Sequence, residues 1–450
     1  MKAEEYLKTL TDQIRCKMAR EAVRDELLAH IEDQKTAYLS EGMEQEEAEE
    51  AAVREMGDPV ETGNEMDRIH RPKMAWGMIA LITALSIAGY VLQKLIEAKV
   101  VEAGGYGWLG SRTLLFLIVG LLLMVGVCFV DYTRIGMYAK EIMIAADVLL
   151  FGAVMFGASV INGAGNYIVL PVIGYVTIDY LALLTVPVYA AVLYAYRGQG
   201  YRAVGKAVLW MIPPVWLVLH IPRLTTAVTL ALSFVVILAI AVWRKWFRIS
   251  RKKTLAGILA VTVIAPVAAG AYYWFFGASY QQERLRYILM DPQESGAGYV
   301  PLMIRQFLEG SRMAGAGTGT TPVELMRIPE IQDFILSGVI AYYGILAAVI
   351  FVGVMLFLLM RFLKISLGQR NQLGMLMGAG CSVLFLVEAA YYLLENLGVI
   401  YIGTFCPFLS YGGTGTMVTY ILLGLLLSIY RYQNTAPERK RAPRISRNPV

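Results

Sequence analysis

Ten stretches of mostly apolar residues follow one another between residues 74 and 431. A helix that crosses the hydrocarbon core of a bilayer needs roughly 20 such residues. Prolines 213, 214 and 222 interrupt the fifth and sixth stretches, which membrane helices tolerate where neighbouring groups satisfy the freed backbone. The pattern predicts an all-α polytopic membrane protein with about ten transmembrane helices. The windows are 74–95, 113–131, 139–161, 174–196, 205–221, 224–243, 254–276, 334–363, 372–394 and 411–431.

Residues 1–73 carry a different pattern, in which apolar positions recur at helical spacing between charged ones. Acidic residues outnumber basic ones by 19 to 11 in this part, whereas the remainder of the chain is basic and mostly apolar. No short apolar core lies near the start, so we expect the segment to stay in the mature protein. The pattern predicts a compact unit of three helices and a helical lead into the membrane.

Lysine and arginine residues gather in alternating loops and thereby predict the orientation of the chain. These loops are expected in the cytoplasm, together with the N-terminal domain and a basic tail at 435–450. The opposite, extracytoplasmic side then carries one long loop at 277–332, and loops of that length are often functional. The basic positions are Arg134, Lys140, Arg197, Arg202, Lys206, Arg244, Lys245, Arg248, Arg251, Lys252, Lys253, Arg361, Lys364 and Arg370.

Composition narrows the classes of function. With 57% hydrophobic and 17% charged residues, the chain has more apolar surface than a soluble globule can bury. The four cysteines and three histidines are scattered, which indicates neither a disulfide framework nor a metal site, although assistance by a divalent cation stays open. The net charge of +5 comes from bases at helix ends, so topology explains it and no nucleic-acid partner is expected.

The first stretch that goes beyond a generic membrane protein lies in the long loop. It combines Arg284 and Arg286 with Tyr299 and ends in spaced glycines that include Gly315 and Gly317. Guanidinium groups form paired hydrogen bonds to phosphate, so these residues are candidates to bind a phosphorylated lipid headgroup. A solvated loop with flexible glycines explains the same residues.

The second stretch, Ile328 to Ile335, lies where the chain re-enters the membrane and contains Glu330 and Asp333. A partly desolvated carboxylate at such a boundary can have its pKa raised toward the range useful for a general base. The alternative is structural, because aspartate is a favoured N-cap and Asp333 directly precedes an apolar helix.

The third stretch, Pro407 to Gly415, lies at the entrance to the last window and contains Ser410, Tyr411, Gly412 and Gly413. A helix start with Ser410 as its cap, or close helix packing through glycine, explains these residues locally. They become candidate substrate-binding residues only in combination with the first two stretches.

Taken in order on this topology, the three stretches resemble the SEDS family of shape, elongation, division and sporulation proteins, whose members include FtsW, RodA and SpoVE. The resemblance covers residues 74–434 and is carried by R-x-R-x4-DP-x5-GY, the PE…DFI re-entry, and PFLSYGG followed by GLLLSIYR. It implies a peptidoglycan glycosyltransferase that polymerises lipid II at the outer face of the bacterial cytoplasmic membrane. It further implies Asp333 as catalytic base, no cofactor, and a class B penicillin-binding transpeptidase as partner.

Residues 1–73 in turn resemble the short prefix domain found ahead of permeases and regulators in Gram-positive bacteria, through EYLKTL, RDELLAHIED and EEAEEAAVREMGDP. That resemblance implies a regulatory or protein-contact role.

The sequence departs from the family pattern at several positions. Ala341 and Tyr342 replace an acidic pair, Arg223 replaces an acid, and Asp179 stands in a divergent Pro-Ser-Glu motif. These changes predict an accessory or sporulation-type paralogue with altered contacts. Intramembrane acids at positions 147, 179 and 388 are expected to be functional or paired. Two further hypotheses remain, namely a transporter of lipid-linked precursors and a non-catalytic scaffold of the cell-wall machinery.

Overall fold

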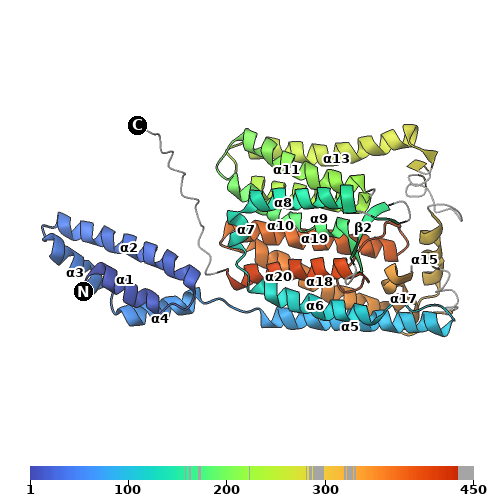
Figure 1. Ribbon diagram of the computed structural model, residues 1–450, viewed down its shortest axis with the longest axis horizontal. Helices are drawn as coiled ribbons and strands as arrows, with labels where there is room; N and C mark the ends of the chain where they lie inside the picture. Colours follow the sequence, from blue (N-terminus) through green and yellow to red (C-terminus); the bar gives the residue numbers. More distant parts are fainter. Residues whose placement is uncertain are drawn as a thin grey trace.

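The computed structural model describes residues 1–157, 159–161, 164–170, 174–221, 223–279, 281–282, 286, 298–318, 321, 328 and 331–433. Arg284, Glu330 and the tail at 435–450, for which the sequence makes predictions, lie outside these residues. The described part is almost entirely helical, so the all-α polytopic fold predicted from the apolar windows is confirmed. Figure 1 shows a small N-terminal unit beside a bundle of long, roughly parallel helices.

The N-terminal unit contains four helices instead of the expected three. They are α1 (Ala3–Asp12), α2 (Lys17–Ser40), α3 (Gln45–Glu55) and α4 (Pro59–His70). The fourth helix is no lead into the membrane, because it packs against α1, and residues 71–75 beyond it are not helical. Asp58 caps α4 by accepting hydrogen bonds from the N–H groups of Val60 and Glu61, with Pro59 in the first turn. A separate core of apolar side chains, including Tyr6, Leu10 and Ile31, holds the unit together.

Each of the ten apolar windows contains a helix. Within the described residues, eight helical segments are long and apolar enough to cross a membrane; α6 and α8 are shorter and run beside them in Figure 1. The helices of the bundle are α5 (Trp76–Glu102), α6 (Ser111–Cys128), α7 (Thr133–Met137), α8 (Ala139–Gly152), α9 (Ile178–Ala182), α10 (Thr185–Ala195), α11 (Tyr201–His220), α12 (Leu224–Trp243), α13 (Arg251–Phe276), α18 (Ile345–Leu367), α19 (Gln372–Asn396) and α20 (Gly413–Arg431).

The bundle is organised around α19. This helix packs against α10, α12, α18 and α20, and 78% of its most apolar window is buried. By contrast, the window of α13 is 0% buried and its main contact is α12, so almost all of its side chains face outward. Since lipid is as apolar as leucine, close packing of small residues and polar contacts must hold the central helices together. Glycines at 374, 378 and 380 of α19, which leave no room for a Cβ, fit that requirement.

A three-stranded antiparallel sheet interrupts the expected third and fourth windows. A short π-helical turn, Ala153–Gly157, ends α8, and the strands β1 (Ser159–Ile161), β2 (Ala164–Leu170) and β3 (Gly174–Thr177) follow. Tyr167 pairs with Thr177 and Leu170 with Gly174. The boundaries 139–161 and 174–196 were therefore wrong at their adjoining ends. Apolar content alone does not separate a helix from a strand, and here β-branched residues alternate with turn-forming glycine and asparagine.

The eighth window is also not one helix, because it breaks at Gly344 into α17 (Ile335–Tyr343) and α18. Gly344 has a φ of 97°, and a Cβ there would lie 2.6 Å from the Cα of Ala314 and 2.7 Å from the carbonyl oxygen of Met313. Only glycine accepts this conformation in so little space. The break lets α15 (Tyr299–Glu309), the 3₁₀ turn η3 (Ile331–Asp333) and α17 gather at one end of the bundle.

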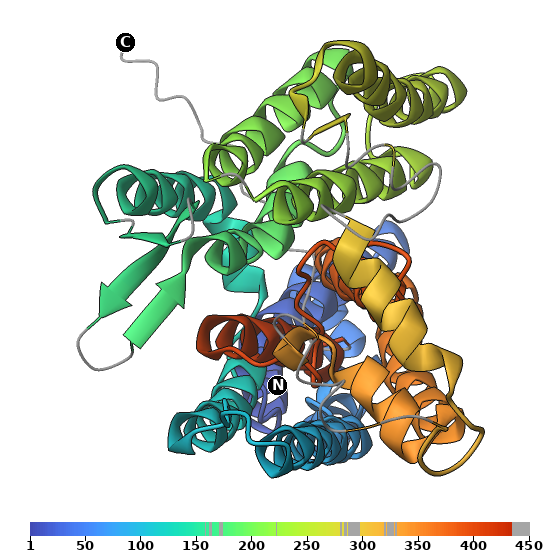
Figure 2. The ribbon, with the colours of Figure 1, turned by 90° about the vertical axis from the view of Figure 1, so that its right-hand side faces the viewer.

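We call this end the far end, because it lies opposite the N-terminal unit in Figure 1, and the other end the near end. Figure 2 views the far end directly and shows the sheet projecting to one side of the helices, with α15 lying across the other side.

Candidate active site at the far end of the bundle

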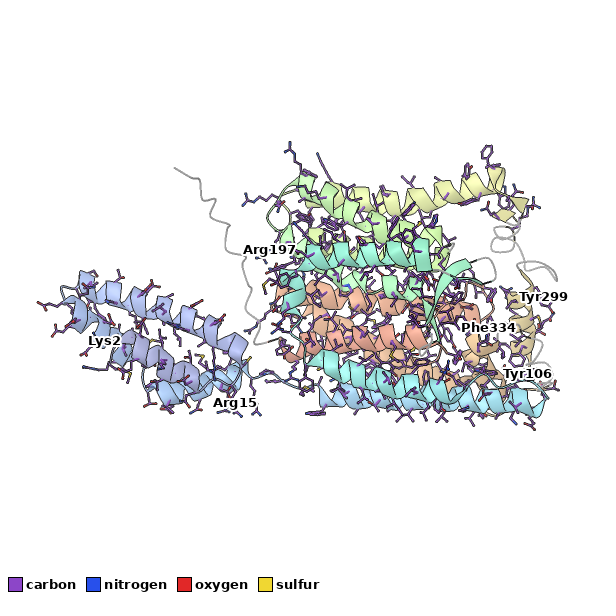
Figure 3. The ribbon with its side chains drawn as sticks, viewed as in Figure 1. Lys2, Arg15, Tyr106, Arg197, Tyr299 and Phe334 are labelled. Atoms are coloured by element: carbon purple, nitrogen blue, oxygen red, sulfur yellow. The ribbon has the colours of Figure 1, made fainter. Side chains whose placement is uncertain are left out.

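Asp333 lies at the far end, on the turn η3 that leads into α17. Figure 3 marks its neighbour Phe334 there, beside Tyr299 and Tyr106, whereas Arg197 marks the near end. The Asp333 side chain is partly exposed, and the buried ring of Phe334 stacks on Tyr401 at 5.8 Å. The N-cap residue of α17 is Phe334, one position after Asp333. The capping explanation for Asp333 is therefore wrong, and its carboxylate stands at the rim of the bundle.

The turn that carries Asp333 is fixed by the fully buried side chain of Asn396, at the end of α19. Its Nδ2 donates hydrogen bonds to the backbone carbonyls of Asp333, at 3.2 Å, and of Tyr392, at 3.1 Å. Its Oδ1 accepts from the N–H of Ser337 at 3.0 Å, while the Ser337 hydroxyl donates to the backbone carbonyl of Asn396 at 2.7 Å. One amide thus uses both donors and its acceptor to join η3, α17 and α19, and sets where the Asp333 carboxylate stands.

The preceding residue, Glu395, fixes a second segment. Its carboxylate accepts hydrogen bonds from the N–H groups of Gly403, at 2.8 Å, and Thr404, at 3.0 Å, with a longer one from Ile402. Glu395 is 1% exposed, and hydrogen bonds from backbone N–H groups stabilise its charge at that depth. Asn396 therefore holds the Asp333 turn, and Glu395 holds the loop before α20.

A second group of acids lies deeper in the bundle. Asp179 is 3% exposed; its Oδ1 accepts from Nδ2 of Asn166 at 2.8 Å, and its Oδ2 from the hydroxyl of Thr226 at 3.0 Å. Glu388, on α19, is 5% exposed. Tyr180 is within electrostatic reach of both acids and also of Asp333. Of these three acids near Tyr180, Asp333 is the most exposed.

Positive charge near this group is limited in the described residues. Arg223 is within electrostatic reach of Tyr180 and donates a hydrogen bond from Nη2 to the hydroxyl of Tyr167, at 3.0 Å. Arg305 donates from Nε to the carbonyl of Gly398, at 2.7 Å, and so attaches α15 to the end of α19. Arg286 is exposed. The predicted headgroup role of Arg286, and of the 42%-exposed Tyr299 at the start of α15, stays a prediction.

Gly315 and Gly317 contribute to the fold directly. Their N–H groups donate to the carbonyls of Tyr343, at 3.1 Å, and Ala341, at 2.8 Å, at the C-terminal end of α17. The carbonyls of Arg312 and Met313 accept in turn from the first N–H groups of α18. The loop 310–318 therefore satisfies both helix ends that the break at Gly344 exposes. The two N–H groups are thereby used within the fold, whereas the sequence had suggested backbone contacts to a headgroup.

Ser410 does not cap the last helix, because α20 begins at Gly413 with Gly412 as its N-cap. Its hydroxyl instead accepts from the N–H of Cys406, at 2.7 Å, and closes a turn in which Phe408 has a φ of 72°. Residues 410–413 line a small cavity of about 50 Å³ between α5, α6 and α20, together with Gln93 and Thr416. Substrate contact by Ser410, Tyr411, Gly412 and Gly413 stays a prediction, and the structure gives all four a common hollow.

Sequence reasoning missed Asn396, Asn166 and Tyr180. Asn396 offered one signal, since it follows an apolar run on α19 and precedes Leu397-Gly398, but position alone did not identify its partners. Asn166 lies on a strand that was expected to be a loop. Its pairing with Asp179 across β2 and α9 was therefore invisible before the sheet was known.

The fold and the site together define a polytopic helical membrane protein that carries a partly exposed acid on a hydrogen-bonded turn at one end of its helix bundle. The chain belongs to the family of FtsW, RodA and SpoVE cell cycle proteins, whose model matches residues 73–435. The family predicted from the three stretches is confirmed.

Among similar proteins, the probable peptidoglycan glycosyltransferase FtsW of Trichlorobacter lovleyi is 23% identical over 80% of this chain and 94% of its own length. The peptidoglycan glycosyltransferase MrdB of Escherichia coli is 26% identical over 70% of this chain and 83% of its own.

Solved structures show the same fold. A chain from a structure of a peptidoglycan synthase complex that coordinates polymerization and crosslinking superposes with a TM-score of 0.63, at 22% identity, over 80% of this chain and 98% of its own. The rod shape determining protein RodA of Thermus thermophilus superposes with a TM-score of 0.56, at 20% identity, over 80% and 97%.

Proposed function

We propose that this chain is a peptidoglycan glycosyltransferase that polymerises lipid II, with Asp333 as its catalytic base. Relatives that cover most of the chain are named for this activity. The observation that carries the assignment of Asp333 is its position on a turn clamped by Asn396, at the rim of the bundle and with its side chain partly exposed. The N-cap position that competed for this acid belongs to Phe334.

The proposed reaction needs a base because a sugar hydroxyl is a poor nucleophile while it holds its proton. The Asp333 carboxylate takes that proton as the hydroxyl oxygen forms a bond to the anomeric carbon of the donor sugar. The bond from that carbon to the lipid diphosphate breaks, and the diphosphate leaves with the electron pair. A single direct displacement of this kind inverts the configuration at the anomeric carbon.

The leaving diphosphate needs positive charge, and candidates for that role are Arg286, Arg312 and Arg223. Arg286 and Arg312 are exposed in the long segment before Asp333, and Arg223 reaches the acidic group from the sheet side. Arg305 is engaged with Gly398 and therefore positions α15 in this scheme.

The proposal places the protein in the bacterial cytoplasmic membrane, with the near end, the N-terminal domain and the basic tail in the cytoplasm. The far end then faces outward, where lipid II is polymerised. Residues 1–73 act as a regulatory unit, and a class B penicillin-binding transpeptidase is the proposed partner. A relative in fold comes from a peptidoglycan synthase complex, which supports a partner in cell-wall synthesis.

The test is the formation of glycan strands from lipid II by the purified chain and by Asp333→Asn. General-base catalysis typically contributes about 10²- to 10⁴-fold, so we expect a rate loss of that order. Glu102→Gln serves as a matched control, because Glu102 is another acid of the far end and forms an ion pair with Lys99 on its own helix. Full activity of Asp333→Asn would remove Asp333 from the mechanism, and inactivity of the wild type would favour the scaffold hypothesis.

One observation favours the transporter hypothesis. Asp179 and Glu388 lie inside the bundle, and no described lysine, arginine or histidine lies within 4 Å of either carboxylate to form an ion pair. Acids at such depth are characteristic of transport pathways. The double variant Asp179→Asn/Glu388→Gln distinguishes the two, because it abolishes transport of a lipid-linked precursor in vesicles but leaves an outer-face polymerase with a functional Asp333.

A further inference from the structure

A hollow lined by cationic side chains lies at the near end, far from Asp333. It is lined by Lys245, Arg248 and Arg251, with Tyr201 and Phe247 among the remaining residues, and has a volume of about 600 Å³. None of its lining residues is acidic. Among the described residues, no carboxylate lies within 4 Å of the three cationic groups. Three unneutralised charges of one sign around one hollow repel one another, and an anion between them relieves that repulsion.

The loop that presents these charges is rigidly built. The carbonyl of Trp246 accepts from the N–H of Gly198 at 2.6 Å, and the N–H of Arg248 donates to the carbonyl of Gln199 at 2.8 Å. The hydroxyl of Tyr201 accepts from the N–H of Ser250 at 3.2 Å. Trp246 is buried beneath the loop, while Lys245 and Arg248 are exposed above it. The cationic side chains therefore start from fixed backbone positions.

The surroundings of the hollow point to a lipid. It lies where α12 ends and α13 begins, and α13 exposes an apolar surface along its whole window. The ring of Trp243 is 60% exposed and lies 4.6 Å from the guanidinium carbon of Arg251. Tryptophan in this position is typical of the headgroup level of a membrane. A phosphate held in the hollow would leave its acyl chains free to lie along α13.

We propose that Lys245, Arg248 and Arg251 form a binding site for the phosphate of an anionic phospholipid headgroup at the near end of the bundle. The site is independent of the proposed transferase chemistry. Within the protein, α13 packs mainly against α12. A lipid bound at this site attaches α13 to the lipid around the protein as well. Basic pockets between membrane helices bind anionic headgroups elsewhere by the same chemistry.

Native mass spectrometry of the full-length chain tests the proposal, with phosphatidylglycerol and phosphatidylcholine of identical acyl chains as probes. We expect the first phosphatidylglycerol to bind at least about tenfold more tightly than phosphatidylcholine, since several bases act on one phosphate. Lys245→Gln/Arg248→Gln should remove this preference, and the charge-retaining Lys245→Arg/Arg248→Lys should restore it. A loss of preference in the Gln variant with restoration in the second shows that charge, and not folding, is responsible.

Arg361→Gln/Lys364→Gln is the matched control, because both residues are exposed bases at the near end of α18 but do not line the hollow. This control should keep the preference. An equal loss in both Gln variants would overturn the proposal in favour of general surface charge. Displacement of the lipid by millimolar glycerol phosphate would overturn the assignment to a lipid, and equal binding of the two lipids by the wild type would overturn the site itself.

Discussion

Two equally buried acids, one in the N-terminal unit and one in the membrane domain, are stabilised by different means. In the N-terminal unit, Asp67 is 3% exposed and accepts hydrogen bonds from the backbone N–H and the Nε of Arg15, at 2.9 and 3.0 Å. In the membrane domain, Asp179 is equally buried but is bonded by the neutral amide of Asn166 and the neutral hydroxyl of Thr226.

The difference shows which of the two acids has its charge compensated by a neighbouring cation. An acid paired with a cation in its own unit has its charge compensated, and its contribution is stability. An acid held by neutral donors, such as Asp179, has no described lysine, arginine or histidine within 4 Å to compensate its charge. Four predictions follow this contrast, from the largest expected effect to the smallest.

Replacing Asn396 by leucine should lower the turnover of lipid II by about 10²-fold, because a 1 Å misplacement of a catalytic group has that order of effect. The leucine leaves the carbonyl of Asp333 and the N–H of Ser337 without their partner. Steady-state kinetics should show kcat falling while KM for lipid II stays nearly constant.

Glu395→Gln provides the control, because it weakens the neighbouring loop at 402–404 without touching the Asp333 turn. If both variants lowered kcat and KM alike, Asn396 would have only a structural role. Asn396 and Glu395 would then not differ in their effect on catalysis.

Replacing Asp179 by leucine should destabilise the membrane domain by about 2–4 kcal/mol, because the Asn166 amide and the Thr226 hydroxyl each lose a partner in a buried place. Asp179→Asn keeps groups of the same shape and should cost far less. Thermal unfolding of the two variants in detergent checks this order. Equal stability of both would mean that Asp179 does not hold the sheet to α12.

Replacing Asp67 by alanine should destabilise the N-terminal unit by about 1–2 kcal/mol. Hydrogen bonds to charged groups contribute roughly 1.5–3 kcal/mol each, and solvent screening at the exposed Arg15 side chain reduces that value. Hydrogen exchange on the full chain should show faster exchange in α1 and α4 and unchanged exchange in α19. A change in α19 would show that the two regions unfold together.

The smallest effect concerns pH. A hydrogen bond from Lys35, 2.5 Å away, together with one from the N–H of Ala3, lowers the pKa of Glu49 below its usual value of 4.5. A lowered pKa in the folded state gives stability that is present above 4.5 and is lost as the pH falls through the folded value. The opening free energy of α1 and α3, obtained from hydrogen exchange after division by the intrinsic exchange rate at each pH, should therefore fall slightly below pH 4.5, and Glu49→Gln should weaken that dependence. An unchanged profile in the variant would show that Glu49 does not contribute.

Much of the fold follows from the sequence because long apolar windows predict membrane-spanning helices directly. The break at Gly344 could not be foreseen, since it depends on the loop 310–318, whose carbonyls and N–H groups satisfy the two helix ends. The sheet was missed because its strands are as apolar as the helices beside them. At the site, Asp333 was identified by family resemblance, whereas Asn396 required knowledge of which backbone groups meet at the end of α19.

The connection at residue 73 couples the ends of the membrane domain. The N–H of Lys73 donates to the carbonyl of Arg431 at 3.2 Å, and the Arg431 guanidinium lies 4.1 Å from the ring centre of Phe129. The chain just before α5 is therefore bonded to the end of α20, and the residue that follows α6 packs against the same arginine. A mechanical load on the N-terminal unit is then shared by α5 and α20. Both of these helices line the small cavity beside Ser410.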